Sequence, residues 1–208
     1  HETQHDKISY ISSLSRIDEG QFVWLDKFTI RNLELLHSSN AGAKTLIDII
    51  DKTTSPMGSR LMRRWLSLPL KNKEQIAARY DIVDFFVNNN ELIDVFHEAI
   101  RQVGDLERLI SKVSLLRVNP RELLQVARAL DQIELLKNLC TENENPCLQL
   151  YAEQLNVCDT IRQRIKKVIS QESPALLSKG NFINEGVDEE LDGLRSLSRS
   201  GKDYLVDM

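Results

Sequence analysis

The stretch NPRELLQVARALDQIELL, residues 119–136, decides the fold that this sequence predicts. Asn119 is a favourable N-cap residue, and Pro120 fits the first helical turn. Glu122 is the third residue after Asn119, the position of the acidic residue in a capping box. The apolar residues that follow recur in steps of three and four: Leu123, Val126, Leu130, Ile133 and Leu136. This spacing places them on one face of a helix. The stretch therefore predicts a long amphipathic helix that begins at Pro120.

The same helix signals recur upstream of this stretch. Ser55-Pro56 predicts a helix start, Pro69 ends that helix, and Asn72 caps the next one. Gly104 then ends a helix and Asp105 caps its successor. Three apolar stripes at helical spacing fall between these signals: Ile76, Tyr80, Val83 and Val87; Leu92, Val95, Phe96, Ala99, Ile100 and Val103; and Leu106, Leu109, Ile110 and Val113. We expect the last of them to be a buried face.

Downstream of the central stretch, residues 142–146 form a polar connector into a further helical stretch. Its apolar face is expected to carry Cys158, Ile161, Ile165 and Val168. Ser173-Pro174 breaks this pattern, and residues 175–186 contain two glycines between short apolar runs that are predicted to be extended. Asp188 then caps a last helix, whose apolar residues are sparse: Leu191, Leu194, Leu205 and Met208.

Residues 8–36 are the least helical part of the sequence. Tyr10–Ile17 and Gln21–Leu25 flank Asp18-Glu19-Gly20, a pattern that predicts a short β-hairpin. Asp26 is expected to cap a short helical turn over residues 27–30. Because proline stands only at the starts and ends of the helical segments, we predict a mostly α fold. It is a helical bundle with a small β-containing N-terminal margin.

Composition and charge are those of an ordinary globular protein. The 208 residues include 27 Lys and Arg against 31 Asp and Glu, a net charge of −4, so the chain as a whole lacks the basic surface of an autonomous nucleic-acid binder. Three cysteines without CxxC spacing favour reduced thiols. No apolar run is long enough to span a membrane, and the first seven residues lack the apolar core of a signal peptide. We expect the chain to be an internal piece of a longer protein.

Candidate chemistry is scarce in this sequence. Residues 41–45, AGAKT, resemble a phosphate-binding loop only in part, because Ala43 stands where that loop needs glycine. The four histidines do not pair with cysteine or carboxylate at metal-ligand spacing. We therefore expect no catalytic, cofactor-binding or metal-binding residues in the chain. A small helical enzyme remains an alternative, which a cleft with convergent, strongly shifted carboxylates would favour.

Arg60, Arg63 and Arg64 are the candidate interdomain contact. They are expected to share one side of the helix that begins at Pro56, where they could contact an acidic neighbouring domain or phosphate. The alternative is a solvated helix face paired with nearby carboxylates of the chain itself. Trp24 and Trp65 are interpreted as core anchors and not as base-stacking platforms, because Trp65 falls on an apolar stripe.

Three stretches in the same order resemble the MutS family of DNA mismatch-repair proteins. They are LDKFTIRNLEL at residues 25–35, TLIDIIDKTTSPMGSRLMRRWLSLPL at residues 45–70, and VGDLERL at residues 103–109 together with NPREL at residues 119–123. The tail EGVDEELD, residues 185–192, is similar to the start of the family's descending lever helix. The resemblance covers the chain from about residue 8 to its end, and the second stretch is its most specific part.

The resemblance implies a division of the chain and a function. Residues 1–25 would close the preceding connector domain, residues 26–183 would form the helical core domain, and residues 184–208 would begin the lever helix, which is cut before the clamp. Such a domain transmits ATP-dependent conformational change between the ATPase and the DNA clamp during recognition of mismatched DNA. It is not itself an enzyme, because the family's phosphate-binding loop is absent from these residues.

Cofactors and partners follow from the same resemblance. The parent protein would use ATP and magnesium, although this piece needs neither. It would act as a homodimer on mismatched double-stranded DNA through domains outside this chain, and it would recruit a MutL-type protein. Its location would be cytoplasmic and nucleoid-associated in a bacterium, or nuclear or mitochondrial in a eukaryote. A helical protein-interaction scaffold with no DNA role, and a family member that works in recombination, remain alternatives.

Overall fold

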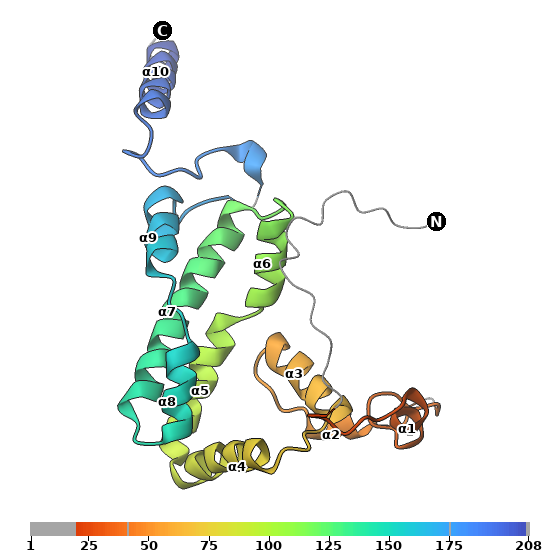
Figure 1. The fold of residues 1–208 in the computed structure, drawn as a ribbon. Coiled ribbons are helices and arrows are strands. Elements are labelled where there is room, and N and C mark those ends of the chain that lie inside the picture. Colours follow the sequence, from red (N-terminus) through yellow and green to blue (C-terminus); the bar gives the residue numbers. More distant parts are fainter. Residues whose placement is uncertain (1–19, 41, 175, 207–208) are drawn as a thin grey trace.

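The computed structural model of the chain describes residues 20–40, 42–174 and 176–206, and Figure 1 shows their arrangement. The elements are α1 (Lys27–Asn32), α2 (Leu46–Ile50), α3 (Pro56–Ser67), α4 (Lys73–Asn88), α5 (Asn90–Val103), α6 (Leu106–Ser114), α7 (Pro120–Glu142), α8 (Pro146–Gln154), α9 (Asp159–Val168), η1 (Leu177–Lys179) and α10 (Glu189–Val206). β pairing in these ranges consists of two isolated bridges. The prediction of a mostly α helical bundle is confirmed.

Local capping explains where these helices begin. The backbone N–H of Glu122 donates to the Asn119 side chain at 2.9 Å, and the Glu122 carboxylate accepts from the Asn119 N–H at 3.1 Å. This is the predicted capping box, and Pro120 occupies the first turn of α7. The other predicted caps are confirmed by hydrogen bonds to a backbone N–H three residues on: Asp26, Ser55, Asn72, Asp105 and Asp188.

The core of the bundle is built around α7. Helices α5, α6, α8 and α9 all pack against it (Figure 1). Ala127 and Ala129 of α7 are completely buried, and such small side chains let neighbouring helices approach closely. At one end, Phe96 of α5 packs with Leu148 and Ala152 of α8. The bundle is therefore organised around α7, with one hydrophobic cluster at the end where α5 meets α8.

The stretch after residue 146 forms two helices, whereas the sequence predicted one. Helix α8 ends at Gln154 and α9 begins at Asp159. Between them the N–H of Cys158 donates to the side chain of Asn156 at 2.9 Å, and Cys158 has a φ of +49°. This left-handed residue ends the predicted continuous helix, and Cys158 becomes the N-cap of α9. The predicted face lies within α9 but is only partly covered: Ile165 and Val168 are half-buried, whereas Ile161 is exposed, with 57% of its surface accessible.

Several apolar residues that were expected in the core lie on the surface. Trp24 and Trp65 are exposed, so their interpretation as core anchors is wrong. Val95 is also exposed, although it shares α5 with buried residues. Ile110 is exposed and no residue of α6 is buried, so the expected buried face of that helix is only partly covered. The physical reason is geometric: a stripe more than about 100° wide extends beyond the line of contact with a single neighbouring helix. Phe96, Ala99 and Val103, at the centre of the α5 stripe, are buried as predicted.

The N-terminal margin contacts the chain after α3. Phe22 forms an antiparallel bridge with Leu70, and the N–H of Val23 donates to the Pro69 carbonyl at 2.7 Å. Residues 10–19 of the predicted hairpin lie outside the described residues. Farther along, Ile169 and Ile183 form the other bridge, as expected for short extended runs in the segment before α10.

Candidate functional site

The three arginines of the candidate interdomain contact lie on α3 but take different directions. Arg60 turns toward the start of α6, whereas Arg63 and Arg64 are exposed. Spacing does not predict this difference, because Arg64 lies only about 40° around the axis from Arg60 and Arg63 about 60° on its other side. The position of Asp105 and Glu107 at the start of α6 is what distinguishes Arg60, and all three arginines are exposed. The structure therefore separates Arg60 from the other two.

Arg60 joins α3 to α6 through two carboxylates. Its guanidinium donates to Asp105 at 2.6 and 3.1 Å, and its Nε donates to Glu107 at 2.8 Å. Asp105 also caps α6, so one carboxylate serves the helix terminus and the ion pair together. The Arg60 guanidinium holds the pKa of the Asp105 carboxyl below its ordinary value. For Arg60 this geometry fits the alternative interpretation, pairing with carboxylates of the chain itself.

Arg63 lies on the side of α3 that faces two carboxylates of the α2 region, Asp48 and Asp51. The pKa of Asp51 is lowered, mainly by hydrogen bonds from Ser59 and Thr53 and to a smaller extent by the Arg63 charge. Arg64 forms no ion pair with any carboxylate of the described residues. The contact of Arg63 and Arg64 with another domain stays a prediction.

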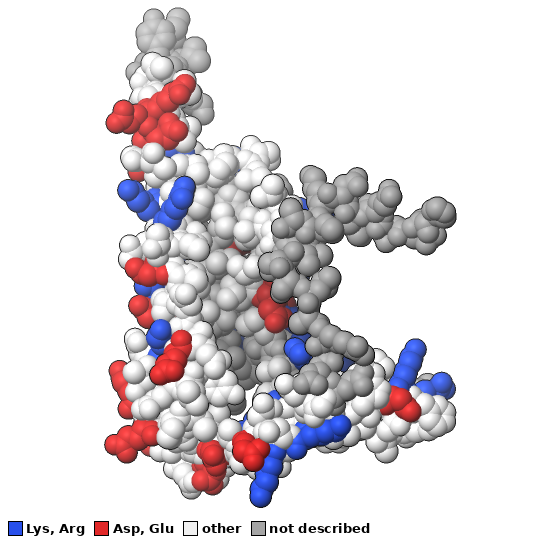
Figure 2. Space-filling view, in the orientation of Figure 1, with Lys and Arg blue, Asp and Glu red and all other residues white. Residues whose placement is uncertain are grey.

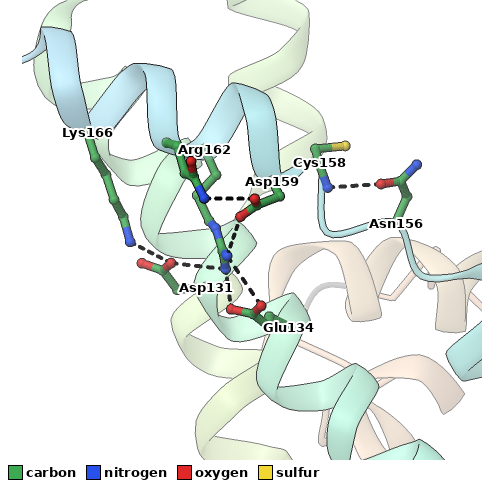
Figure 3. Close-up of polar contacts among 8 residues, drawn as sticks. Asp131, Glu134, Asn156, Cys158, Asp159, Arg162 and Lys166 are labelled. Carbon is green, nitrogen blue, oxygen red and sulfur yellow. Dashed lines mark hydrogen bonds and ion pairs between the residues drawn. The ribbon is translucent and has the colours of Figure 1, made fainter.

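A second ion-pair cluster, which the sequence did not reveal, joins α7 to α9 (Figure 3). Arg162 of α9 has a side chain only 11% exposed and pairs with Glu134 of α7 and Asp159 of α9. It also lies 3.4 Å from Asp131, which in turn pairs with Lys166 at 2.6 Å. A largely covered arginine among three carboxylates fixes the register of the two helices.

The sequence contains a signal for this cluster that can be recognised only once the pairing of the helices is known. Asp131 and Glu134 are three residues apart on α7, and Arg162 and Lys166 are four residues apart on α9. Each pair therefore lies on one face of its helix. Many other pairs of charged residues in the chain are also three or four residues apart. The spacing alone therefore does not identify α9 as the helix that pairs with α7.

The base of α10 is attached to the segment before it. Asp188 accepts from the N–H of Leu191 at 2.9 Å, and Asp192 accepts from the N–H of Gly186 at 2.6 Å. The Arg195 guanidinium donates to the Ile183 carbonyl at 3.0 Å. These contacts hold the first turns of α10, and the helix then extends away from the bundle (Figure 1).

An open polar hollow of about 660 Å³ lies at the base of α10, lined in part by Ser170, Lys179, Asn184 and Arg195. It bears on the alternative of a small enzyme, which requires carboxyls with shifted pKa values in a cleft. Every carboxyl with a shifted pKa in the described chain has that pKa lowered by hydrogen bonds or ion pairs, and none of these carboxyls lines this hollow. A general acid would need a raised pKa, so the hollow gives that alternative no support.

The described residues contain no cluster of three or more His, Cys, Asp or Glu side chains that could hold a metal ion. The three cysteines are free, and no described helix is both long and apolar enough to cross a membrane. The expectations of no catalytic role and no cofactor stay predictions.

Known proteins that this chain resembles belong to one family. Residues 28–206 match the family model described as MutS domain III. The chain is 48% identical over 204 residues to the DNA mismatch repair protein MutS of Flavobacterium psychrophilum, and 49% identical over 205 residues to that of Parabacteroides distasonis. These alignments cover 98% and 99% of the chain. The chain spans only 24% of the length of each of these relatives.

Proposed function

The chain belongs to the MutS family through its domain III, and from this premise we propose that it is the structural core and lever base of a MutS-type DNA mismatch-repair protein. In this role it carries ATP-dependent movement between the ATPase and the DNA-contacting clamp of the longer protein. The proposed division is residues 1–25 for the end of the connector, 26–183 for the core and 184–208 for the start of the lever.

One observation carries this proposal: α10 extends from the bundle at the end opposite α4 (Figure 1). Arg195 binds the Ile183 carbonyl, and Ile183 pairs with Ile169 at the end of α9, so this segment connects α10 to the bundle. A displacement of the bundle end would therefore move the helix with it. Between α4 and α10 runs α7, whose 23 residues span roughly 35 Å at 1.5 Å per residue. Packed helices of this kind move as rigid bodies, which supports transmission over that distance.

The longer protein supplies what this chain does not contain. We extend the proposal to ATP and magnesium at its ATPase, to mismatched double-stranded DNA bound through its other domains, and to a homodimer that recruits a MutL-type protein. The bacterial relatives favour a bacterial parent, in which the protein would act in the cytoplasm on the nucleoid. The present chain then has no catalytic step of its own.

A DNA-binding titration tests the mechanical role. Labelled duplexes, mismatched and fully paired, are titrated with this chain at low and near-physiological salt, and binding is followed by fluorescence anisotropy. We expect weak binding that salt abolishes equally for both duplexes, because phosphate contacts alone give such salt dependence. Tight, salt-resistant binding that prefers the mismatch would mean that the chain reads DNA itself, and the proposed role would be wrong.

Transmission itself is tested in the longer protein. Reversal of Arg63 and Arg64 to glutamate is expected to slow ATP-triggered release from mismatched DNA while this chain remains folded. Arg60 is left unchanged, because it pairs with Asp105 and Glu107 of its own chain. The matched control is Arg164→Glu, an exposed arginine on α9. Mismatch binding and ATP hydrolysis are measured separately, so that loss of coupling is distinguished from loss of either site. Unchanged release in the double variant would argue against an interdomain role for these arginines and favour a scaffold.

A further inference from the structure

Helix α10 is attached to the bundle mainly through the segment that leads into it. None of the other described helices packs extensively along α10, and its apolar residues Leu194 and Leu197 are 58% and 71% exposed. Residues 169–188 run from the end of α9 to the first turn of α10 (Figure 1). The direction in which α10 leaves the bundle therefore depends on how this segment is held.

Asn184 binds this segment to the C-terminal end of α9. Its side-chain amide donates to the carbonyl of Lys167 at 2.8 Å and also lies 3.2 and 3.3 Å from the carbonyls of Ile169 and Lys166. Its backbone N–H donates to the Val168 carbonyl at 2.9 Å. The last four carbonyls of a helix have no partner within the helix. Asn184 therefore satisfies carbonyls that α9 leaves open, and it does so from the segment that leads to α10.

The first half of the segment is also fixed to α7. The N–H of Ser170 donates to the Phe182 carbonyl at 3.0 Å, and the Ser173 hydroxyl donates to the Ser170 carbonyl at 2.5 Å. Ser173 is 1% exposed, and its own carbonyl accepts from Nε of Arg121 on α7 at 2.8 Å. The segment is therefore anchored to two helices of the bundle before it reaches Asn184.

Arg195 makes the corresponding contact from α10. Its guanidinium donates to the carbonyl of Ile183 at 3.0 Å and pairs with Asp192 of the same helix at 3.3 Å. Asn184 and Arg195 thus act on adjacent residues of the segment, one from the α9 side and the other from the α10 side. We call Ile183, Asn184 and Arg195 the lever joint. All three line the open hollow of about 660 Å³, so close packing does not replace their hydrogen bonds on that side.

Charges of opposite sign lie on the two sides of the lever joint. The first turn of α10 contains Glu189, Glu190 and Asp192, and the last turn of α9 contains Lys166 and Lys167. Figure 2 shows carboxylates over the base of α10 and cations over the neighbouring end of α9. Exposed charges of this kind are screened by salt within about 10 Å at 0.1 M, and they set no single direction. Hydrogen bonds are directional, so those of the lever joint are the contacts that fix an angle.

We propose that Asn184 and Arg195 are positioning residues that set the direction of α10 relative to the bundle. The proposal rests on the proposed function in that α10 is the base of the lever. The alternative is that Asn184 only caps α9, in which case α10 keeps its direction without this side chain. Carbonyls at the end of a helix carry partial negative charge, so a neutral N–H donor suits this place and a carboxylate does not. Asn184→Asp therefore removes the contact at nearly constant side-chain size.

Pulsed electron paramagnetic resonance in the longer protein tests this assignment. Spin labels are attached through p-acetylphenylalanine at Glu153 on α8 and Ser198 on α10, which are both exposed. Labelled protein is diluted with unlabelled protein, so that each distance arises within one chain. Without nucleotide or DNA, we expect one narrow distance distribution when the lever joint is intact. Asn184→Asp and Arg195→Met should each broaden it roughly twofold, because a segment held by fewer contacts samples more hinge angles.

The matched control is Asn181→Asp, the same change at an exposed asparagine of the same segment, and it should leave the distribution narrow. Equal broadening in this control would overturn the proposal, because any added charge in the segment would then move α10. An unchanged distribution in Asn184→Asp would show that Asn184 only caps α9. Broadening of the wild-type distribution to the same width by raised salt would show that the exposed charges hold the helix, which also contradicts the proposal.

Amide hydrogen exchange verifies that α9 remains folded in each variant. If α9 loses protection in Asn184→Asp, Arg195→Met decides, because its contact is with Ile183 and not with α9. An unchanged distribution in that variant would overturn the proposal. Transmission is measured separately, as the shift that ATP causes in the wild-type distribution. Absence of that shift would count against the proposed function and would leave the assignment of the lever joint intact.

Discussion

The guanidinium of Arg60 lies 2.6 Å from a carboxylate oxygen of Asp105, which is 45 residues away in the sequence. This contact, together with Glu107, joins α3 to the start of α6. Because Asp105 is also the N-cap of α6, a movement of α3 acts on a helix terminus and not on a mobile side chain. The pair is therefore a direct contact between the N-terminal helices and the bundle.

The Arg60–Asp105 pair predicts a pH dependence of stability. The pKa of Asp105 is lowered in the folded chain from its ordinary value of 3.8, so the pair stabilises the fold above that pH. The contribution is lost as the pH falls through the lowered pKa, where the carboxylate takes up a proton. Asp105→Asn keeps a good N-cap but removes the charge. Urea unfolding should show a wild-type advantage over Asp105→Asn at pH 7 that disappears as the pH falls below 3.8. A difference that persists unchanged in acid would contradict the assignment.

Phe96 is expected to be the most sensitive position of the core cluster. Its side chain is 7% exposed and packs edge-to-face with Phe86 at 5.0 Å. Phe96→Ala should lower the free energy of unfolding by about 3–5 kcal/mol, because it removes apolar contact and leaves a cavity. Val95→Ala, on the same helix but 43% exposed, should lower it by less than about 1 kcal/mol. Chemical denaturation measures both, and equal losses would mean that the cluster is not the centre of the core.

Gly104 is predicted to be required for its backbone conformation and not for space. It ends α5 with a φ of +66°, and a Cβ built there meets no atom within 4 Å. Gly104→Ala should therefore destabilise the chain by about 1–2 kcal/mol from backbone strain alone. Gly193→Ala is the control, since Gly193 lies inside α10 with open space around it. That change should raise helicity, since alanine favours helices over glycine by about 1 kcal/mol. Circular dichroism and thermal unfolding show whether each variant is less or more stable than the wild-type chain.

Arg162 is expected to hold α9 against α7. Arg162→Met removes the cation and leaves Asp131, Glu134 and Asp159 close to one another, where their like charges repel. Backbone amides of α9 should then exchange hydrogen severalfold faster, while those in the middle of α7 remain protected. The exposed Arg164→Met is the matched control and should leave exchange unchanged. Similar exchange in both variants would show that the cluster does not secure α9.

The family and the helix starts were available from the sequence, because both depend on short stretches. A cap such as Asn119 with Glu122 acts over three residues and needs no distant partner. Residues 45–70 carry the family resemblance, and the match to MutS domain III over residues 28–206 confirms it. The break at Cys158 was missed because a left-handed φ at a cysteine leaves no mark in apolar spacing.

Only the tertiary structure decided which apolar faces are covered. The sequence shows the stripe containing Tyr80, Val83 and Val87 clearly, yet it is the inner residues Phe85 and Phe86 that contact the core. Spacing reports that a face is apolar, but burial depends on which helix packs against it from elsewhere in the chain. The partner of Arg60 is hidden from the sequence for the same reason. Local chemistry therefore determined the helices, and packing between distant segments determined the surfaces that they leave open.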